Sequence, residues 1–362
     1  MARLGDVCQK ATSNIAQKDL ENRNGEYEIY GASGFIKKVD FYQQENPYIA
    51  VVKDGAGIGR VMKLPAKTSV IGTMQYIIPN NDIDISYLAY AMENMNLAKY
   101  YTGATIPHIY FKDYQKEELP VPSLEEQRKI AAVLDKVSDL IAKRRQQLEK
   151  LDLLVKARFV EMFGTFPANE KNWNVGKIRD VINEAKYGSS RPAIEGGQYP
   201  YLRMNNITYS GELDLSDIKQ IDVPESELPK CTVQRGDVLF NRTNSKELVG
   251  KTCVYDRDEM MVLAGFVIRV RVNERVLPEF LSEFLNTDFS KQMLLGMCKT
   301  AIGQANINAQ EMQNIGIYIP PIELQKEFVD FRNEIKKTKD IISQSLGKLE
   351  ILKKALMQEY FG

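Results

Sequence analysis

The chain has 362 residues but only one histidine, one tryptophan and four cysteines. The cysteines form no CxxC pair and have no histidine nearby, which argues against a zinc site and a disulfide framework. The single histidine, His108, leaves no second one for a histidine-based mechanism. Long apolar runs are also missing: none approaches the roughly 20 residues of a membrane helix, and the first residues lack a signal-peptide pattern. We therefore expect a soluble, cytoplasmic protein without a metal site.

Net charge is absent as well, because 48 basic residues balance 48 acidic ones. Composition alone therefore gives no indication of a nucleic-acid partner. A DNA-binding protein with this balance would have to gather its basic residues on one face. The apolar content of 44% and the charged content of 27% are ordinary for globular proteins. The length suggests two or three domains.

What the sequence does contain is one segment present twice. "VPSLEEQRKIA" begins at Val121 and "IPPIELQKEF" begins at Ile319, so that proline, glutamate and glutamine recur at an offset of 198 residues. Each copy opens a stretch that ends in "FG", at residues 163–164 and 361–362. In the first copy, Ser123 and Glu126 have the spacing of a capping box. These features predict two long helices, over residues 123–164 and 321–362.

Apolar residues in both stretches recur every three or four positions, close to the 3.5-residue period of a coiled coil. Each predicted helix would be roughly 55–60 Å long. One helix cannot bury such a stripe alone, so we expect the two helices to pair. In the first copy the stripe comprises Ile130, Val133, Val137, Leu140, Arg144, Leu148, Leu151, Val155, Phe159 and Met162.

A stretch of mixed α/β character precedes each helix. The first contains "YIAVVKDGAGIGRV" from Tyr48 and the second contains "GDVLFNRTNS" from Gly236. Both patterns predict a strand, a polar or glycine-containing loop and a second strand. The starts "RLGDV" and "KIRDV" are also alike. The sequence thus predicts an α+β fold: two mixed α/β domains joined by two long antiparallel coiled-coil helices, as an internal repeat with pseudo-twofold symmetry.

Three short motifs carry weak signals of catalytic chemistry. "DGAGIGR" at residues 54–60 has GxGxG spacing rather than GxGxxG, which favours a turn between strands over a cofactor loop. "NPY" at residues 46–48 lacks the second proline of the amino-methyltransferase signature. "EAK" at residues 184–186 has a nuclease-like spacing without an upstream Pro-Asp. We expect that the chain by itself is not an enzyme.

The duplicated helix starts, the "FG" ends, "YGASGFI" at residues 30–36 and the two strand-loop motifs together resemble the specificity subunits of Type I restriction–modification systems. The resemblance spans essentially the whole chain. It implies two target-recognition domains, residues 1–122 and 165–320, each reading one half of a bipartite double-stranded DNA target. It also implies that the helices act as spacers and dock two methyltransferase subunits, which restriction/translocase subunits join.

Under this resemblance, methyl transfer and cleavage belong to partner subunits. S-adenosylmethionine, ATP and Mg²⁺ would be bound there, and this chain would hold no cofactor. Helices of roughly 55–60 Å would limit the two domains to a separation of about 17 base pairs at about 3.4 Å each. The alternative is a coiled-coil adaptor or scaffold protein that does not read DNA.

Residue type guides the choice of DNA contacts, since Arg suits guanine, Asn and Gln suit adenine, and Lys, Ser and Thr bind phosphates. Such loops are often plain turns, and His108 could equally pack a domain against a helix. The acidic segment 211–227 should face away from DNA, either as a solvated surface, which we favour, or against a methyltransferase subunit. The predicted DNA-binding residues are Lys53, Thr105, His108, Tyr110, Lys112, Arg203, Asn205, Asn241, Arg242, Thr243, Asn244, Ser245, Lys246, Gln304, Asn306 and Asn308.

Overall fold

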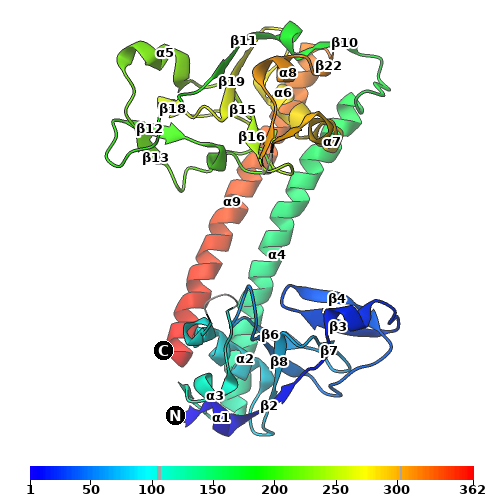
Figure 1. Cartoon of the computed structure of the whole chain (residues 1–362), viewed down its shortest axis with the longest axis vertical. Coiled ribbons are helices and arrows are strands. Elements are labelled where there is room, and N and C mark those ends of the chain that lie inside the picture. The colour runs from blue at the N-terminus through cyan, green and yellow to red at the C-terminus, as the bar shows by residue number, and fades with distance from the viewer. Residues whose placement is uncertain (104–106, 302–303) are drawn as a thin grey trace. The chain divides into compact units, whose positions relative to one another are not determined.

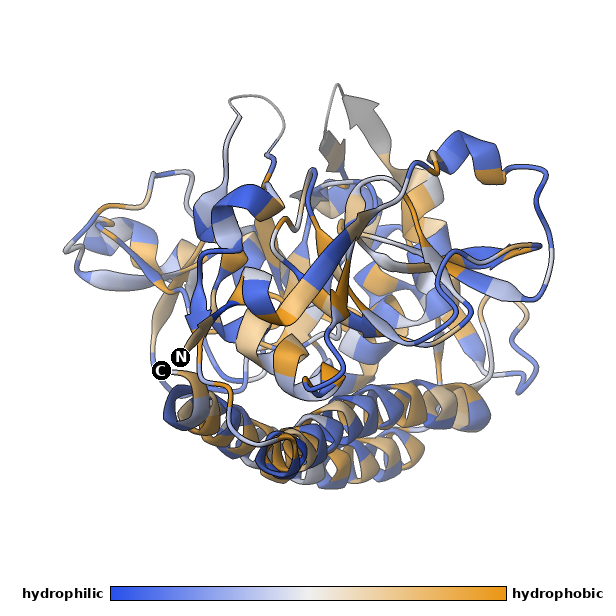
Figure 2. Cartoon of the chain, turned by 90° about the horizontal axis from the view of Figure 1, so that it is seen from below, coloured by the Kyte–Doolittle hydropathy of each residue, from blue (hydrophilic) through white to orange (hydrophobic). Residues whose placement is uncertain are grey.

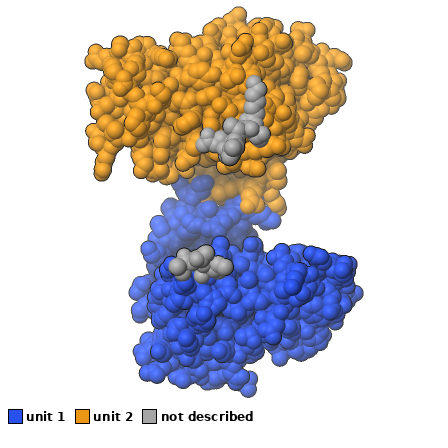
Figure 3. Space-filling model, viewed as in Figure 1, with its two compact units in different colours: residues 1–146, 343–362 blue, residues 147–342 orange. Residues whose placement is uncertain are grey.

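The computed structural model of the chain describes residues 1–103, 107–301 and 304–362 (Figure 1). Two helices of forty residues, α4 (Leu124–Phe163) and α9 (Ile322–Phe361), confirm the helices predicted from the duplicated segment. The chain divides into two compact units, described separately below (Figure 3). Unit 1 comprises residues 1–146 and 343–362, and unit 2 comprises residues 147–342. Each unit therefore contains one domain, one part of α4 and one part of α9.

Unit 1 is built on a four-stranded antiparallel sheet in the order β2 (Cys8–Thr12), β8 (Met74–Pro79), β5 (Tyr48–Val52) and β6 (Val61–Leu64). A three-stranded sheet contains β4 (Gly34–Val39), β3 (Tyr27–Gly31) and β7 (Ser69–Val70), of which β3 and β7 are parallel. The remaining elements are β1 (Ala2–Arg3) paired with β9 (Glu118–Leu119), and the helices α1 (Leu4–Val7), α2 (Ile85–Asn94) and α3 (Phe111–Tyr114). Every residue of β5 is buried, as its apolar run predicts.

Unit 2 repeats this plan. Its main sheet has the order β11 (Ile182–Tyr187), β19 (Val267–Val272), β15 (Val238–Asn241) and β17 (Thr252–Val254). The second sheet contains β13 (Lys219–Ile221), β12 (Tyr199–Leu202), β18 (Met261–Leu263) and β14 (Thr232–Val233), with β12 and β18 parallel. The equivalents of β1, β9, α2 and α3 are β10 (Asn174–Lys177), β22 (Gly316–Ile319), α6 (Pro278–Asn286) and α8 (Ala309–Gln313).

Unit 2 also has elements of its own. They are α5 (Leu228–Cys231), α7 (Asp288–Met297) and a small sheet of β16 (Thr243–Asn244), β21 (Gln304–Asn306) and β20 (Lys299–Ala301). The small sheet adds strands to the loop that follows β15. The shared frame with different additions is the pattern expected when loops carry the specific work.

A buried glutamine fixes each domain to the long helix that follows it. In unit 1 the side chain of Gln127 accepts a hydrogen bond from the amide of Asp84 at 2.9 Å, and it donates to the carbonyls of Asp82 and Pro122. In unit 2 Gln325 makes the same three bonds, to Leu277, Arg275 and Pro320. The duplicated glutamine therefore links the helix start to the loop before α2 or α6 in both units.

The far end of the other long helix packs against the same domain. In unit 2 the ring of Phe163, at the end of α4, lies 5.0 Å from the ring of Phe280 in α6. In unit 1 Phe361, at the end of α9, lies 5.1 Å from Tyr87 in α2. Gly164 then ends α4 in the left-handed region, with φ +81°. The matched "FG" ends are thus equivalent anchors.

The two long helices contact each other within each unit, and apolar and polar residues alternate along both (Figure 2). In unit 1 Arg145 Nη2 and Glu350 Oε1 form an ion pair at 2.7 Å. In unit 2 the rings of Phe159 and Phe328 lie 5.2 Å apart. The predicted antiparallel pairing is confirmed by these contacts, since the start of one helix meets the end of the other.

Two residues that we assigned to the helix stripe lie outside it. Val133 is 41% exposed and Leu140 is 38% exposed, whereas the following residues Leu134 and Ile141 are buried. The prediction was wrong because it considered only the partner helix. Over this part of α4 the buried face also packs against α2, where Tyr90 belongs to the same cluster as Leu134.

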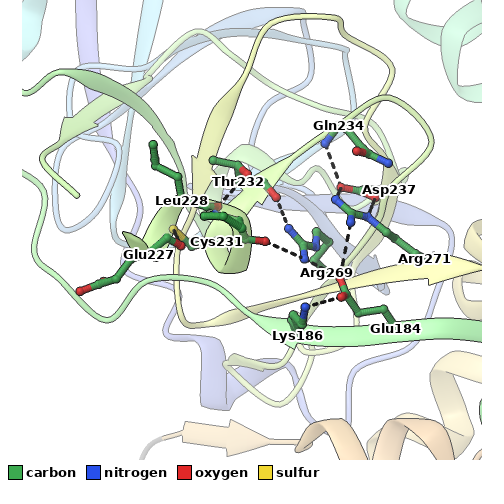
Figure 4. A network of polar contacts seen from close by, with 11 residues as sticks. Glu184, Lys186, Glu227, Leu228, Cys231, Thr232, Gln234, Asp237, Arg269 and Arg271 are labelled. Atoms are coloured by element: carbon green, nitrogen blue, oxygen red, sulfur yellow. Dashed lines mark hydrogen bonds and ion pairs between the residues drawn. The ribbon is translucent and has the colours of Figure 1, made fainter. Parts of the chain in front are cut away.

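A polar network in unit 2 explains the nuclease-like "EAK" motif structurally (Figure 4). Glu184 on β11 is paired with Arg269 and Lys186, and Arg271 Nε donates to Asp237 Oδ1 at 2.8 Å. Burial alone would raise the pKa of Glu184, but the hydrogen bonds from Lys186 and Arg269 outweigh it and lower that pKa. The charged residues of the motif therefore form ion pairs within the sheet that contains β11, β19 and β15, which gives the motif a structural role.

Within residues 1–103, 107–301 and 304–362, no helix combines the length and apolarity needed to cross a membrane.

We predict that replacing either buried glutamine by leucine, as Gln127→Leu or Gln325→Leu, destabilises its own unit by about 2–3 kcal/mol. The reason is that backbone groups lose their partners in a buried place. The measurement is the urea midpoint of unfolding. Gln146→Leu is the matched control, because Gln146 is exposed on α4. Midpoints equal to that of the control would contradict the anchoring role.

Candidate nucleic-acid interface

The loop between the last two strands of the main sheet in each unit is the first part of the candidate interface. We call it the hairpin loop: residues 53–60 between β5 and β6, and residues 242–251 between β15 and β17. A second stretch lies beside it in each unit. We call this stretch the closing segment, residues 107–110 in unit 1 and 305–308 in unit 2.

The glycine-rich motif "DGAGIGR" forms the hairpin loop of unit 1. Gly55, Gly57 and Gly59 all have positive φ, at +82°, +89° and +79°. Glycine adopts this region without steric cost, so the motif builds a tight connection between antiparallel strands. The turn favoured from its spacing is what the structure contains.

Equivalent backbone hydrogen bonds join the hairpin loop to the closing segment in the two units. The amide of Ile109 donates to the carbonyl of Lys53 at 2.9 Å, and the amide of Ile307 donates to the carbonyl of Arg242 at 2.9 Å. Ile109 and Ile307 have the 198-residue offset of the repeat. The first residue of the hairpin loop, Lys53 or Arg242, is therefore placed in the same way in both units.

In unit 1 four of the predicted DNA-binding residues lie around this backbone bond: Lys53, His108, Tyr110 and Lys112. The ring of Tyr110 lies 4.2 Å from that of His108, and Lys112 Nζ lies 5.2 Å from the centroid of the Tyr110 ring. His108 Nδ1 contacts the carboxylate of Asp54, which lies next to Lys53 in the hairpin loop. Tyr110 is 46% exposed and Lys112 is exposed, so an aromatic face and one lysine are open to a ligand, whereas Lys53 is partly buried and pairs with Asp54.

In unit 2 the corresponding group is centred on Arg242. Its guanidinium lies 4.9 Å from the centroid of the Tyr187 ring, and its Nη2 donates to Asn306 Oδ1 at 2.9 Å. Asn306 pairs with Thr243 across β21 and β16. Stacking and hydrogen bonding hold the guanidinium in one orientation, as base recognition by arginine requires. Asn244 completes β16 next to this group.

Three further predicted residues have different environments. Ser245 and Lys246 are exposed in the same hairpin loop. Asn241, by contrast, is fully buried at the end of β15, and its Nδ2 donates to the carbonyl of Leu248. Its side chain therefore shapes the hairpin loop from inside.

Asn308 caps a helix. Its Oδ1 accepts from the amide of Glu311 at 2.9 Å, and the carboxylate of Glu311 accepts from the amide of Asn308, which is a complete capping box. Thr105 lies outside the described residues. Gln304 lies in β21, but its side chain is outside the described part of the structure.

Arg203 and Asn205 lie on another segment, the turn that follows β12. Asn205 is exposed there. Arg203 Nη2 donates to Asp217 Oδ2 at 2.7 Å, and hydrogen bonds from Arg203 and Lys219 lower the pKa of Asp217. These residues are separate from the Arg242 group along the chain.

The acidic segment 211–227 is partly neutralised within unit 2. Besides the Asp217 pairs, Glu212 forms an ion pair with Lys339 of α9 at 2.6 Å, and Glu227 pairs with Arg191 at 2.7 Å. These partners explain why so many acids are tolerated together in one segment. Clusters of three or more histidine, cysteine, aspartate or glutamate side chains able to hold a metal are not found in the described parts of the chain.

A second candidate surface lies on the long helices. "KLDLLVKA" at residues 150–157 and "KLEILKKA" at residues 348–355 are equivalent at the 198-residue offset. Each presents an exposed apolar pair, which we call the docking pair. The exposed fractions are 63% and 45% for Leu153 and Leu154, and 71% and 45% for Ile351 and Leu352. Sequence reasoning missed these pairs because it assigned the apolar residues of the helices to the stripe that faces the partner helix.

The profile described as the Type I restriction modification DNA specificity domain matches residues 1–151 and again residues 170–350. The chain belongs to this family.

Individual relatives agree. The chain is 27% identical over 394 residues to the Type I restriction enzyme MjaVIII specificity subunit of Methanocaldococcus jannaschii, covering 99% of this chain and 90% of that protein. It is 26% identical over 243 residues to the EcoKI specificity subunit of Escherichia coli (strain K12), covering 63% of this chain and 52% of that protein. The match thus spans about half the length of the EcoKI relative.

Solved structures share the fold. The S subunit of a Type I restriction–modification system from M. genitalium matches with a TM-score of 0.60 at 15% identity, over 100% of this chain and 95% of that one. A chain from a structure of a type I R-M system, described in terms of complex assembly and conformational transition, matches with a TM-score of 0.54 at 16% identity, over 99% and 96%. The predicted fold class and the resemblance are confirmed.

A lysine beneath the hairpin loop of unit 2 gives a pH-dependent prediction. Burial lowers the pKa of Lys291 in α7 to about 7, with further lowering by Lys156 and Lys251 and opposition from Glu283. Lys291 Nζ donates to the carbonyl of Gly250 at 2.6 Å. In the unfolded chain a lysine has a pKa of about 10.4, so the unfolded state binds more protons between these values.

The free energy of unfolding of unit 2 should therefore rise as the pH increases from about 7 toward 10, and this contribution is lost as the pH falls toward 7. We predict that Lys291→Met flattens the increase in Tm between pH 7 and pH 9. Lys230→Met is the control, because Lys230 is exposed on α5. An unchanged slope in Lys291→Met would show that Lys291 does not titrate in this range.

Proposed function

We propose that the chain is a DNA-specificity subunit in which each domain reads one half of a bipartite double-stranded target. The observation that carries the proposal is that the specificity-domain profile matches twice, once on each domain. In both domains the hairpin loop and the closing segment are joined by the same backbone bond. The two loop sets then carry different side chains, as two independently specified half-sites require.

The proposed contacts follow from residue chemistry. In unit 2 the oriented guanidinium of Arg242 is suited to a guanine edge, and exposed Asn306 to an adenine edge. Lys246 and Ser245 are suited to phosphates. In unit 1, Lys53 and Lys112 would bind phosphates, while His108 and Tyr110 supply a polar edge and an aromatic face. Because the net charge of the chain is zero, the electrostatic attraction to DNA phosphates would have to come from such local clusters of basic residues.

Partner subunits would carry out the chemistry. We propose that two methyltransferase subunits dock on the helices and that restriction/translocase subunits join them. S-adenosylmethionine, ATP and Mg²⁺ would be bound by these partners. Support for two copies of one partner comes from the docking pairs, because the repeat presents the same exposed apolar pair twice. Exposed apolar residues flanked by Lys150 or Lys348 suit an apolar pocket with an acidic rim.

The long helices would set the distance between the two half-sites. Each has forty residues, about 60 Å at 1.5 Å per residue. Because the domains read only where they touch DNA, the bases between them would remain unread. An adaptor protein would also use paired helices, but it would not need two equivalent loop clusters with base-reading side chains.

The test of this function is selection from a random duplex library by the chain co-expressed with the methyltransferase encoded beside it. We expect a bipartite sequence, two short fixed halves separated by a gap of constant length, because two loop clusters read separate sites. Sequencing of the enriched duplexes gives the result. An intact complex that enriches no sequence would favour the adaptor interpretation.

The docking pairs give a prediction about assembly. Leu154→Glu should remove one methyltransferase copy, Leu352→Glu should remove the other, and the double variant should remove both, because each places a charge in an apolar contact. Native mass spectrometry measures the stoichiometry. Gln146→Glu and Gln344→Glu are matched controls, since both glutamines are exposed and equivalent in the repeat. Full stoichiometry in the double variant would show that docking occurs elsewhere.

A further inference from the structure

The hairpin loop ends in the same way in both units. Gly59 has φ +79° and Gly250 has φ +78°. The amide of each glycine donates to the last residue of the preceding strand, at 2.8 and 2.7 Å. A cationic residue follows at once, Arg60 in unit 1 and Lys251 in unit 2. The positive φ, which glycine adopts freely, fixes the point from which this cationic side chain leaves the backbone.

Both cations reach across to a different loop. Arg60 Nη1 donates to the carbonyl of Ala32 at 2.7 Å. Lys251 Nζ donates to the carbonyl of Met204 at 3.1 Å and to that of Ile207 at 2.5 Å. The acceptors lie in the turns that follow β3 and β12. We call each of these contacts the loop tie.

The acceptors are equivalent in the repeat. The carbonyls of Tyr30 and Leu202 accept hydrogen bonds of 3.0 and 2.8 Å from the residue that follows β7 or β18. Ala32 and Met204 each lie two residues further along the chain. Equivalent cations therefore contact equivalent carbonyls, although unit 1 has Arg where unit 2 has Lys and the acceptor turns differ in length and sequence. The presence of the contact in both units despite these differences indicates a shared role.

The environment of the loop tie differs between the units. Lys251 is 7% exposed, and burial lowers its pKa. A buried ammonium group is costly unless its donors are satisfied, and here carbonyl oxygens satisfy them. Arg60 is exposed, so water competes for its bond. Removal should therefore have a larger effect at Lys251 than at Arg60.

In unit 2 the loop tie holds a turn that carries predicted DNA contacts. Arg203 and exposed Asn205 flank Met204, whose carbonyl is bound by Lys251. The turn is also closed by Asn206, whose Oδ1 accepts from the amide of Arg203 at 2.8 Å. Lys251 thus connects this turn to the loop that carries Arg242.

We propose that Arg60 and Lys251 are specificity-positioning residues, which hold the turn after β3 or β12 in fixed register with the hairpin loop. Neither needs to touch DNA. Each makes two loops act as one rigid surface, so that a wrong base cannot be accommodated by movement of one loop alone. This proposal rests on the proposed function. It names the residues that determine how well each domain discriminates between base sequences.

The expected effect is on discrimination, defined as the Kd for a duplex with one half substituted divided by the Kd for the full duplex. Lys251→Met should lower discrimination at one half by roughly tenfold, the size of one well-placed base contact. Arg60→Met should lower discrimination at the other half, by less. Lys251→Arg should restore it, because unit 1 uses arginine at this position.

The experiment uses the full chain co-expressed with the methyltransferase. The probes are the bipartite duplex recovered by selection and two versions with one half substituted. Wild type, Lys251→Met, Lys251→Arg and Arg60→Met are compared, with Lys230→Met as the control for loss of one positive charge. The complementary pattern, one half affected by each Met variant, together with rescue by Lys251→Arg, is the result expected.

Other outcomes overturn the inference. Unchanged discrimination in an assembled Lys251→Met complex does so, as does equal loss at both halves. If Lys251→Met does not assemble, Arg60→Met decides, because Arg60 is exposed and its loss should not prevent folding. Loss at one half then supports the inference, and no loss overturns it. If the wild-type complex enriches no bipartite sequence, the proposed function fails. If the wild type enriches such a sequence but the variants keep its discrimination, only the positioning role of Arg60 and Lys251 fails.

Discussion

A long amphipathic helix cannot bury its apolar face alone, and this constraint determines how the chain is organised. Each unit solves it by combining a domain with the start of one long helix and the end of the other. Gln127 and Gln325 fix the helix starts through three buried hydrogen bonds each. Phe361 and Phe163 pack the helix ends against α2 and α6. The apolar face of each long helix is therefore buried only because the chain contains the second, equivalent helix.

On this common frame the loops differ. The hairpin loop of unit 1 is glycine-rich and places Lys53 beside His108, whereas that of unit 2 contains a short strand and an arginine stacked on Tyr187. The backbone bonds that place these loops are nevertheless the same in both units. Under the proposed function, a fixed frame with different side chains would allow one half-site to change while the other is kept. Physical independence of the two loop sets is what a bipartite target requires.

Much of this fold could be predicted from sequence, because it depends on patterns repeated along the chain. The Pro–x–x–Glu–x–Gln segment, the apolar strands and the helix periodicity are local signals that the sequence shows directly. The exposure of Val133 depends on α2, which periodicity cannot reveal. Burial of Asn241 and the bond from Lys251 to Met204 depend on the path of loops far apart in sequence. Polar residue type alone could not distinguish a DNA contact from a residue that shapes the loop.

The most direct test of the account is to shorten both long helices by one heptad, residues 143–149 and 341–347, which are equivalent at the 198-residue offset. The bipartite sequence enriched by this variant is then compared with that of the wild type. One heptad corresponds to about 10.5 Å of helix, or about three base pairs. The account predicts a gap shortened by about that amount with both half-sites unchanged. Altered half-sites with the original gap would contradict it.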